Sequence, residues 1–203
     1  MILGKDDLLR AIAGKNRGLL ATETDKAAIL SAVARLEDRN PTPNPLEAAE
    51  LLDGNWQLLY TTSQELLGID RFPLYNLGQI YQCVRVRDRK IYNVAELRGI
   101  PYLEGMVSVA AAFEPTSNRR VDVKFERFIV GLQRFIFGTT SSSNGSPVLD
   151  RFIENIESGQ RFWALDFKVQ PGERSGWLEI TYLDKDLRIG RGNVGSVFVL
   201  SKV

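Results

Sequence analysis

Apolar and polar residues follow two different periods along this chain of 203 residues. Through residues 5–38, apolar side chains recur at three- and four-residue spacing, which is the period of an amphipathic helix. The glycine-containing stretch 14–18 interrupts this pattern and predicts a break between two helices. Thr24 precedes Asp25 and is expected to cap the second helix.

From Trp56 onward the period changes to two, which is typical of strands with one buried face. Turn signals rich in glycine, proline, asparagine and aspartate separate this first stretch from eight others. The others cover 79–87, 91–98, 106–113, 120–130, 160–169, 177–183, 187–191 and 196–201. Short strands in this number, divided by turns, predict an all-β barrel or sandwich.

The helical and strand-rich parts are joined by a proline-rich segment. Residues 40–45 cannot continue a helix and therefore predict a linker. A short helix is expected after it, over 46–52, and another, over 148–156, is expected within the strand-rich part. We therefore expect a helical segment, 1–53, packed against a mainly β unit, 54–203.

Composition excludes several kinds of chemistry. Histidine is absent and Cys83 is the single cysteine, so Cys/His zinc sites, histidine-dependent catalytic triads and intramolecular disulfides are excluded. The formal net charge of +1 argues against nucleic acid as a partner. Carboxylate chemistry and oxygen-ligated metal ions remain compatible with this composition. Our overall expectation is nevertheless no catalytic residue, no metal ion and no cofactor.

The chain also lacks targeting signals that composition would reveal. No apolar run reaches the length of about 20 residues that a membrane-spanning helix needs. The N-terminal segment carries Asp6 and Asp7, and it has neither the order of a secretory signal nor the composition of a transit peptide. The sequence is therefore expected to be a complete cytosolic protein or a processed one.

Strict alternation assigns faces on the predicted strands. Val121, Val123, Phe125, Arg127 and Ile129 share one face, which its apolar majority marks as inward. Arg127 is therefore expected within an apolar wall, where a charge needs either a partner or a cavity.

Two tight turns are expected near the C-terminal end. Asp184 and Asp186 have no third or fourth oxygen ligand nearby, so a turn is favoured over a calcium site. A glycine-rich hairpin turn follows, in which Gly192 and Asn193 are expected to supply positive φ angles.

Two motifs carry most of the functional information. The triplet at 54–56, Gly-Asn-Trp, matches the GxW that opens the first strand of lipocalins, and a core tryptophan after a helix end explains it equally well. Arg188 and Arg191 lie on one predicted strand at an odd spacing, so only one of them faces inward if the strand is regular. The inward arginine either stacks on an aromatic ring near the barrel floor or binds the carboxylate or diphosphate of a ligand.

With their flanking residues, these motifs resemble the plastid lipid-associated proteins, also called plastid fibrillins. The resemblance spans residues 5–203 and rests on LLDGNWQLLYTTS and on YLDKDLRIGRGNVGSVFVL. It implies a lipocalin-like antiparallel β-barrel preceded by α-helices, which binds or organises prenyl lipids such as quinones or carotenoids. It also implies a location in the cytoplasm or on the thylakoids of a cyanobacterium, or in the stroma, thylakoids or lipid bodies of a plastid.

The favoured hypothesis is a non-enzymatic carrier or structural binder of prenyl lipids that also contacts a membrane or lipid-body surface. An apolar ligand would gain roughly 25 cal/mol for each Å² removed from water, and an inward arginine would orient its polar head. The residues expected to contact the ligand are Trp56, Phe125, Arg127, Trp163, Tyr182, Arg188 and Arg191.

Two other classes of function stay open. The chain could instead be an adaptor that supports a prenyl-lipid biosynthetic enzyme or coats a membrane, with a filled barrel and an exposed apolar segment such as 128–137. A buried continuation of a strand explains the same segment. An isomerase that uses Asp166 or Glu179 is disfavoured, because the chain has no histidine and no nucleophile motif.

Overall fold

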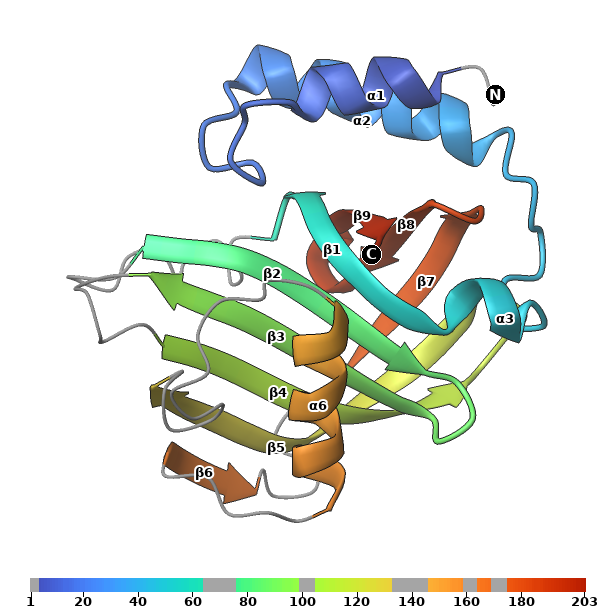
Figure 1. Cartoon of the computed structure of the whole chain (residues 1–203). Coiled ribbons are helices and arrows are strands. Elements are labelled where there is room, and N and C mark those ends of the chain that lie inside the picture. Colours follow the sequence, from blue (N-terminus) through green and yellow to red (C-terminus); the bar gives the residue numbers. More distant parts are fainter. Residues whose placement is uncertain (1–3, 64–75, 99–104, 133–145, 159–163, 169–174) are drawn as a thin grey trace.

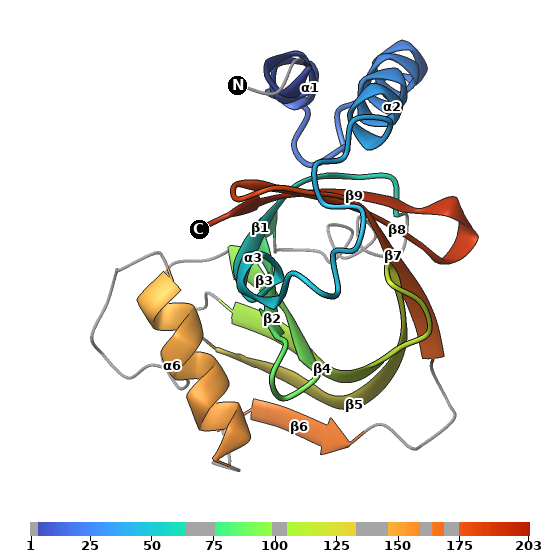
Figure 2. The ribbon, with the colours of Figure 1, turned by 90° about the vertical axis from the view of Figure 1, so that its right-hand side faces the viewer.

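The computed structural model describes residues 4–63, 76–98, 105–132, 146–158, 164–168 and 175–203. An antiparallel β-barrel lies at its centre, with helices against two sides of it (Figures 1 and 2). The mainly β barrel preceded by helices that the sequence predicts is therefore confirmed.

Two helices precede the barrel, α1 (Lys5–Ile12) and α2 (Glu23–Glu37). The expected cap of α2 was wrong by two residues, because Thr24 lies inside the first turn of the helix. Thr22 is the cap, and its hydroxyl accepts a hydrogen bond from the backbone N–H of Asp25. The carboxylate of Asp25 accepts one from the backbone N–H of Thr22 in return, which satisfies two N–H groups at this helix end.

The other elements follow the linker that the sequence predicts. Two further helices are α3 (Ala49–Leu52) and α6 (Ser146–Glu157). The strands are β1 (Gly54–Thr61), β2 (Asn76–Arg85), β3 (Lys90–Arg98), β4 (Gly105–Pro115), β5 (Arg120–Leu132), β6 (Ala164–Lys168), β7 (Ser175–Leu183), β8 (Leu187–Gly192) and β9 (Val197–Lys202), with a short 3₁₀ turn, η2 (Asn193–Gly195), between β8 and β9. Among the described residues, no helix combines the length and the apolar character needed to cross a membrane.

Eight antiparallel strands close the barrel, because β9 pairs with β1 and β5 pairs with both β4 and β7. β5 is long enough to have two neighbours along one edge. Its residues 120–124 pair with β7, whereas its residues 127–131 pair with β6. β6 therefore continues the wall beyond the first residue of β7 without being one of the barrel's eight strands.

The barrel has two ends, which the strand directions define. At the α3 end, β1 begins and α3 inserts Leu52 among the interior side chains. At the opposite end, here called the far end, β1 ends at Thr61 and β2 begins at Asn76.

Apolar side chains form three clusters, one inside the barrel and two outside it. The interior cluster joins residues of α3 and the strands. The second lies between α1, α2 and the outer faces of β1, β7, β8 and β9. The third lies between α6 and the outer faces of β2–β5, as the placement of α6 in Figure 2 shows. Both faces of much of the barrel wall are thus buried, which explains why its strands are apolar on both sides.

Candidate ligand-binding site

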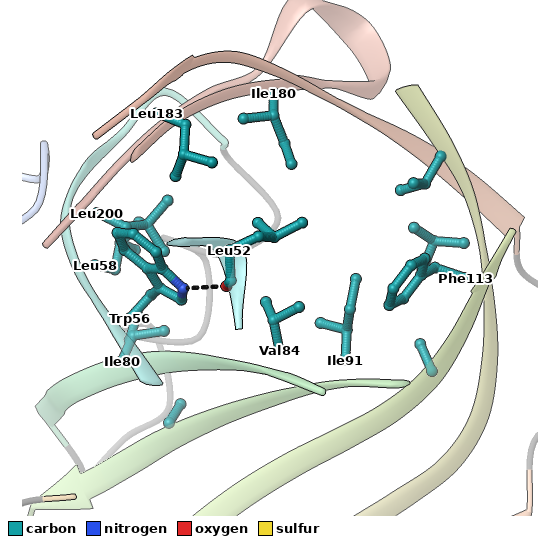
Figure 3. Packing of buried hydrophobic residues seen from close by; sticks show 14 residues of the cluster. Leu52, Trp56, Leu58, Ile80, Val84, Ile91, Phe113, Ile180, Leu183 and Leu200 are labelled. Carbon is teal, nitrogen blue, oxygen red and sulfur yellow. Dashed lines mark hydrogen bonds between the residues drawn. The ribbon is translucent and has the colours of Figure 1, made fainter. Parts of the chain in front are cut away.

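The barrel interior near the α3 end is packed with apolar side chains, which point inward from the surrounding strands (Figure 3). The buried members of this cluster are Leu52, Trp56, Leu58, Ile80, Val84, Ile91, Ala95, Ala111, Phe113, Val121, Val123, Ile180, Leu183 and Leu200. Leu52 comes from α3, so this helix supplies a side chain to the interior as well as covering that end. The α3 end is therefore the closed end of the barrel.

Trp56 lies in the interior, as the GxW motif predicts, and its side chain is fully buried. Its indole N–H donates a hydrogen bond of 2.9 Å to the carbonyl oxygen of Leu52. The guanidinium carbon of Arg188 lies 4.8 Å from the centre of the indole ring, and the ammonium nitrogen of Lys202 lies 5.2 Å from it. Such cation–π contacts contribute about 0.5–2 kcal/mol each, depending on how far the cation is removed from water.

Arg188 is the arginine that faces inward, with only 2% of its surface exposed. One guanidinium N–H donates to the side-chain oxygen of Gln82, an inward residue of β2 between Ile80 and Val84. Burial lowers the pKa of Arg188 to about 9, so the side chain keeps its charge at neutral pH. A buried cation therefore lies beside Trp56 in an apolar interior.

Arg191 faces outward, because β8 is regular against β9 and the two arginines differ by an odd number of positions. Its guanidinium binds both carboxylate oxygens of Glu37 on α2, at 2.8 and 2.7 Å. Hydrogen bonding to Glu37 raises the pKa of Arg191. This bidentate pair joins α2 to the barrel wall, so Arg191 lies outside the interior.

The inward face expected for Arg127 was wrong, and a β-bulge is the reason. Ala110 and Ala111 of β4 pair with Arg127 and Phe125, so Glu126 between them has no partner and the alternation of β5 shifts by one. Phe125 packs against the interior cluster, as expected. Arg127 instead lies on the outer face, where its guanidinium donates to the carbonyl oxygen of Ile156 on α6 at 2.8 Å.

Tyr182 also lies outside the interior, after an irregularity of β7 at Thr181. Its fully buried ring belongs to the cluster under α1 and α2. Its hydroxyl donates a hydrogen bond of 2.8 Å to Asp184. Trp163, the remaining residue of the predicted set, lies outside the described residues, so its contact with a ligand stays a prediction.

Toward the far end, some inward-facing apolar side chains are only partly buried, although Ala95, which pairs with Val107, is buried. On β4, Val107 and Val109 share the face of the interior residue Ala111, and solvent reaches both of them. Across the ladder they pair with Val130 and Phe128, which are partly exposed as well. Solvent reaches an inward side chain only where neighbouring atoms do not fill the space beside it. This part of the wall is therefore the candidate site for an apolar ligand.

A groove of about 510 Å³ lies outside the barrel, between α6 and the α3 end. Its lining is mainly polar and includes Asn55, Arg85 and Asp150. Arg85 binds Asp150 at 2.7 Å, and Asn55 donates to the same carboxylate at 2.9 Å. These contacts attach α6 to β1 and β2 and leave little apolar surface, so this groove does not match a lipid.

Sequence reasoning missed the structural role of Asp184. Its carboxylate accepts hydrogen bonds from the backbone N–H groups of Asp186 and Leu187, which forms the expected turn. It also forms an ion pair with Lys5 of α1 at 2.8 Å and accepts a hydrogen bond from the hydroxyl of Tyr182. No local signal announces the contact with Lys5, because 179 positions separate the two residues.

Gln82 and Lys202 were missed as well. Gln82 is one of several polar residues on a strand, and Lys202 stands at a strand end where lysine is common on protein surfaces. Lys202 nevertheless lies on the inward side of β9, and its ammonium sits at the α3 end of the barrel, where it donates to the carbonyl oxygen of Leu51 at 2.8 Å and borders the outer groove. Only the closure of the barrel brings these residues and Arg188 together around Trp56.

The residues considered for catalysis do not form a site in the part of the chain that the structure describes. Glu179 faces outward and pairs with Arg119 at 3.3 Å. The side chain of Asp166 lies outside the described residues. Within the described residues, no three acidic or cysteine side chains gather as metal ligands.

Comparison with known proteins decides the family. The sequence profile of the PAP_fibrillin family matches residues 3–201, nearly the whole chain. The chain belongs to the PAP_fibrillin family. The resemblance inferred from the two sequence motifs is thereby confirmed.

Relatives in this family include plant proteins named for lipids or plastids. The chain is 36% identical to plastoglobulin-1 of Pisum sativum, across 98% of this chain and 60% of that protein. It is 33% identical to a chloroplastic light-induced protein of Solanum demissum, across 98% of this chain and 66% of that protein. It is 32% identical to a chromoplast-specific carotenoid-associated protein of Cucumis sativus, across 98% of this chain and 67% of that protein. The chain thus spans roughly two thirds of the length of these relatives, and no solved structure matches it.

Proposed function

We propose that this PAP_fibrillin chain binds small apolar molecules, prenyl lipids such as quinones or carotenoids, inside its barrel and catalyses no reaction. The observation that carries this proposal is the partial exposure of inward-facing apolar residues near the far end, Val107, Val109, Phe128 and Val130. A ligand placed against them would remove from water apolar surface that the folded chain leaves accessible.

The structure supports a smaller set of contact residues than the sequence motifs suggested. Trp56, Phe125 and Arg188 belong to the interior and stay in the proposed site. Arg127, Tyr182 and Arg191 contact helices outside the barrel, so we assign them to the attachment of these helices.

The names of the relatives support a location for this activity. One relative is a plastoglobulin and another is a carotenoid-associated protein of chromoplasts. We propose that this chain likewise works at plastid membranes or lipid bodies, or at the thylakoids of a cyanobacterium.

A titration with decylplastoquinone tests this function, with quenching of tryptophan fluorescence as the measurement. We expect saturable quenching with the unaltered protein. The substitution Val109→Phe adds an aromatic ring to the inward face near the far end, so we expect affinity to fall roughly tenfold or more because the ligand and the ring compete for space.

Leu20→Phe is the matched control, because Leu20 is 66% exposed on the outer surface and receives the same ring. Its affinity should equal that of the unaltered protein. Absence of saturable quenching, or equal affinity of the Val109→Phe and Leu20→Phe variants with unchanged melting temperatures, would contradict an interior site.

An adaptor or membrane-coating role is a second candidate, and exposed apolar side chains favour it. Leu20 is 66% exposed and Val194 is fully exposed. Both lie within three residues of a segment that contacts the end of β1. The backbone N–H of Thr61 donates to the carbonyl oxygen of Arg17, and the backbone N–H of Thr62 donates to that of Val197. This role replaces the proposed carrier function if two results are found together. The protein does not bind quinone, and liposomes bind the unaltered protein but not the double variant Leu20→Ser, Val194→Ser.

A further inference from the structure

Arg188 differs from Arg191 and Arg85, two other arginines that join elements of this fold. Arg191 pairs with Glu37, and Arg85 pairs with Asp150. Arg188 is more deeply buried than either, yet among the described residues no carboxylate lies within ion-pair distance of its guanidinium. Its contacts are the neutral amide of Gln82 and the face of Trp56.

A cation in this situation is incompletely compensated. A buried charge is costly unless it is paired and hydrogen-bonded, and a guanidinium carries five N–H donors. Gln82 accepts from one nitrogen of Arg188, and the indole ring supplies a weaker attraction. An anion beside Arg188 would supply the missing counter-charge.

The alternative role for Arg188, closure of the barrel floor, is already performed by other groups. Lys202 donates to the carbonyl oxygens of Glu50 and Leu51, which ties the last strand to α3. The indole N–H of Trp56 binds the carbonyl of Leu52 in the same helix. In the described part of the chain, Arg188 forms no hydrogen bond with α3, so these bonds hold the closed end without it.

We propose that Arg188 binds the carboxylate of an amphipathic ligand whose apolar chain extends from the closed end toward Val107, Val109 and Phe128. This inference rests on the proposed function, because it names the head group of a ligand held in the same interior. Arginine suits this task because its planar guanidinium binds both oxygens of a carboxylate.

The charge available in the interior selects a single carboxylate over a diphosphate. Within the described ranges, Arg188 and Lys202 are the cations beside Trp56, and the ammonium of Lys202 is already bound to two carbonyl oxygens. One uncompensated positive charge matches one negative charge, whereas a diphosphate carries more charge than these groups neutralise. A neutral quinone carbonyl would accept a hydrogen bond but would leave the cation without a counter-ion.

The comparison of a fatty acid with its own ester tests the inference on the unaltered protein. cis-Parinaric acid and its methyl ester have the same fluorescent apolar chain and differ only in the charge of the head. We expect the acid to bind about tenfold or more tightly than the ester, because hydrogen bonds to charged groups are the stronger ones.

Arg188→Gln then assigns the preference to this residue. The variant should bind acid and ester with equal affinity, while Arg188→Lys retains part of the preference because the charge remains. Arg119→Gln is the control for loss of one positive charge, since Arg119 is half exposed and pairs with Glu179 outside the interior. It should keep the full preference for the acid.

Each outcome separates this inference from the function on which it rests. Equal affinities of the unaltered protein for acid and ester overturn the carboxylate site and leave an apolar carrier intact. Binding of neither probe overturns both proposals. If Arg188→Gln fails to fold, the acid and ester affinities of the unaltered protein and of Arg188→Lys decide the question.

Discussion

Along β8, side chains three positions apart contact opposite sides of the barrel wall. Arg188 lies over Trp56 in the interior, whereas Arg191 binds Glu37 on α2. Arginine suits both positions, because its flat guanidinium stacks on aromatic rings and also binds carboxylates with two parallel hydrogen bonds. Asp184, before the same strand, binds Lys5 of α1. The motif at the end of the chain therefore connects the interior, the wall and the two N-terminal helices.

The turn that follows β8 differs from expectation in a way that affects stability. Gly192 and Asn193 were expected to supply positive φ angles, but Val194 and Gly195 do so, at 58° and 72°. Gly192 is instead extended, with φ −136°. A β-branched residue at positive φ is strained by roughly 1–2 kcal/mol, because its Cβ crowds the following carbonyl.

Replacement of Val194 by asparagine should relieve this strain. Asparagine tolerates the left-handed conformation, and the fully exposed valine side chain has no packing to lose. We expect Val194→Asn to raise the free energy of unfolding by about 1 kcal/mol, measured by urea denaturation. Ser196→Asn, at an ordinary φ of −59°, is the control and should bring no gain. An unchanged or lower stability of Val194→Asn would show that the turn is not strained.

At the scale of elements, the sequence predicts correctly which face a side chain points to in a regular strand, and it fails after a β-bulge. Trp56, Phe125 and the opposite faces of Arg188 and Arg191 follow from regular alternation and were predicted correctly. Arg127 follows an extra residue in β5. A bulge needs no particular residue type, so alternation continued past it assigns the wrong face.

The same reasoning explains the misplaced tyrosine and a third irregularity. The register of β7 shifts between Ile180 and Tyr182, and that of β1 shifts between Leu58 and Tyr60. In both strands the first residue faces the interior and the tyrosine faces α1 and α2. The sequence predicts the strands themselves, because their period is sustained over many residues. It does not predict the shifts, because tertiary packing on both sides of the wall determines them.

The attachment of α1 to the barrel depends on the ionisation of Asp184. Partial burial alone would raise its pKa, but hydrogen bonds from Lys5, from backbone N–H groups and from Tyr182 lower the pKa overall. A carboxyl with a lowered pKa in the folded state stabilises the fold at pH values above its unfolded pKa. That contribution disappears as pH falls through the lowered pKa of the folded protein.

We expect Asp184→Asn to lower the free energy of unfolding at neutral pH by roughly 1–3 kcal/mol, because Lys5 loses a buried partner. The difference between the variant and the unaltered protein should begin to shrink as pH falls through about 4, the unfolded-state pKa, and disappear only below the lowered pKa of the folded carboxyl. Urea denaturation between pH 3 and pH 7 measures this. Asp186→Asn is the control, because its side chain is 60% exposed and lies 3.5 Å from Lys5. A pH-independent difference would contradict the assignment.

At the scale of the whole molecule, the barrel is supported from two sides, and among the described residues some inward-facing side chains near the far end are only partly buried. α1 and α2 cover one side and α6 covers another (Figure 2). The closed end is filled by Leu52, Trp56 and their neighbours, whereas Val107 and Val109 remain accessible on the inward face. Apolar packing on the outside of the wall holds the strands in place without requiring that the interior be filled. This arrangement is what a carrier of apolar molecules needs.

A crystal structure of the protein grown with decylplastoquinone tests the central claim most directly. The account predicts electron density for the ligand inside the barrel, in contact with Val107, Val109 and Phe128 and extending toward Trp56. Density for the ligand on the outer surface alone, with protein side chains filling the interior from α3 to the far end, would contradict it.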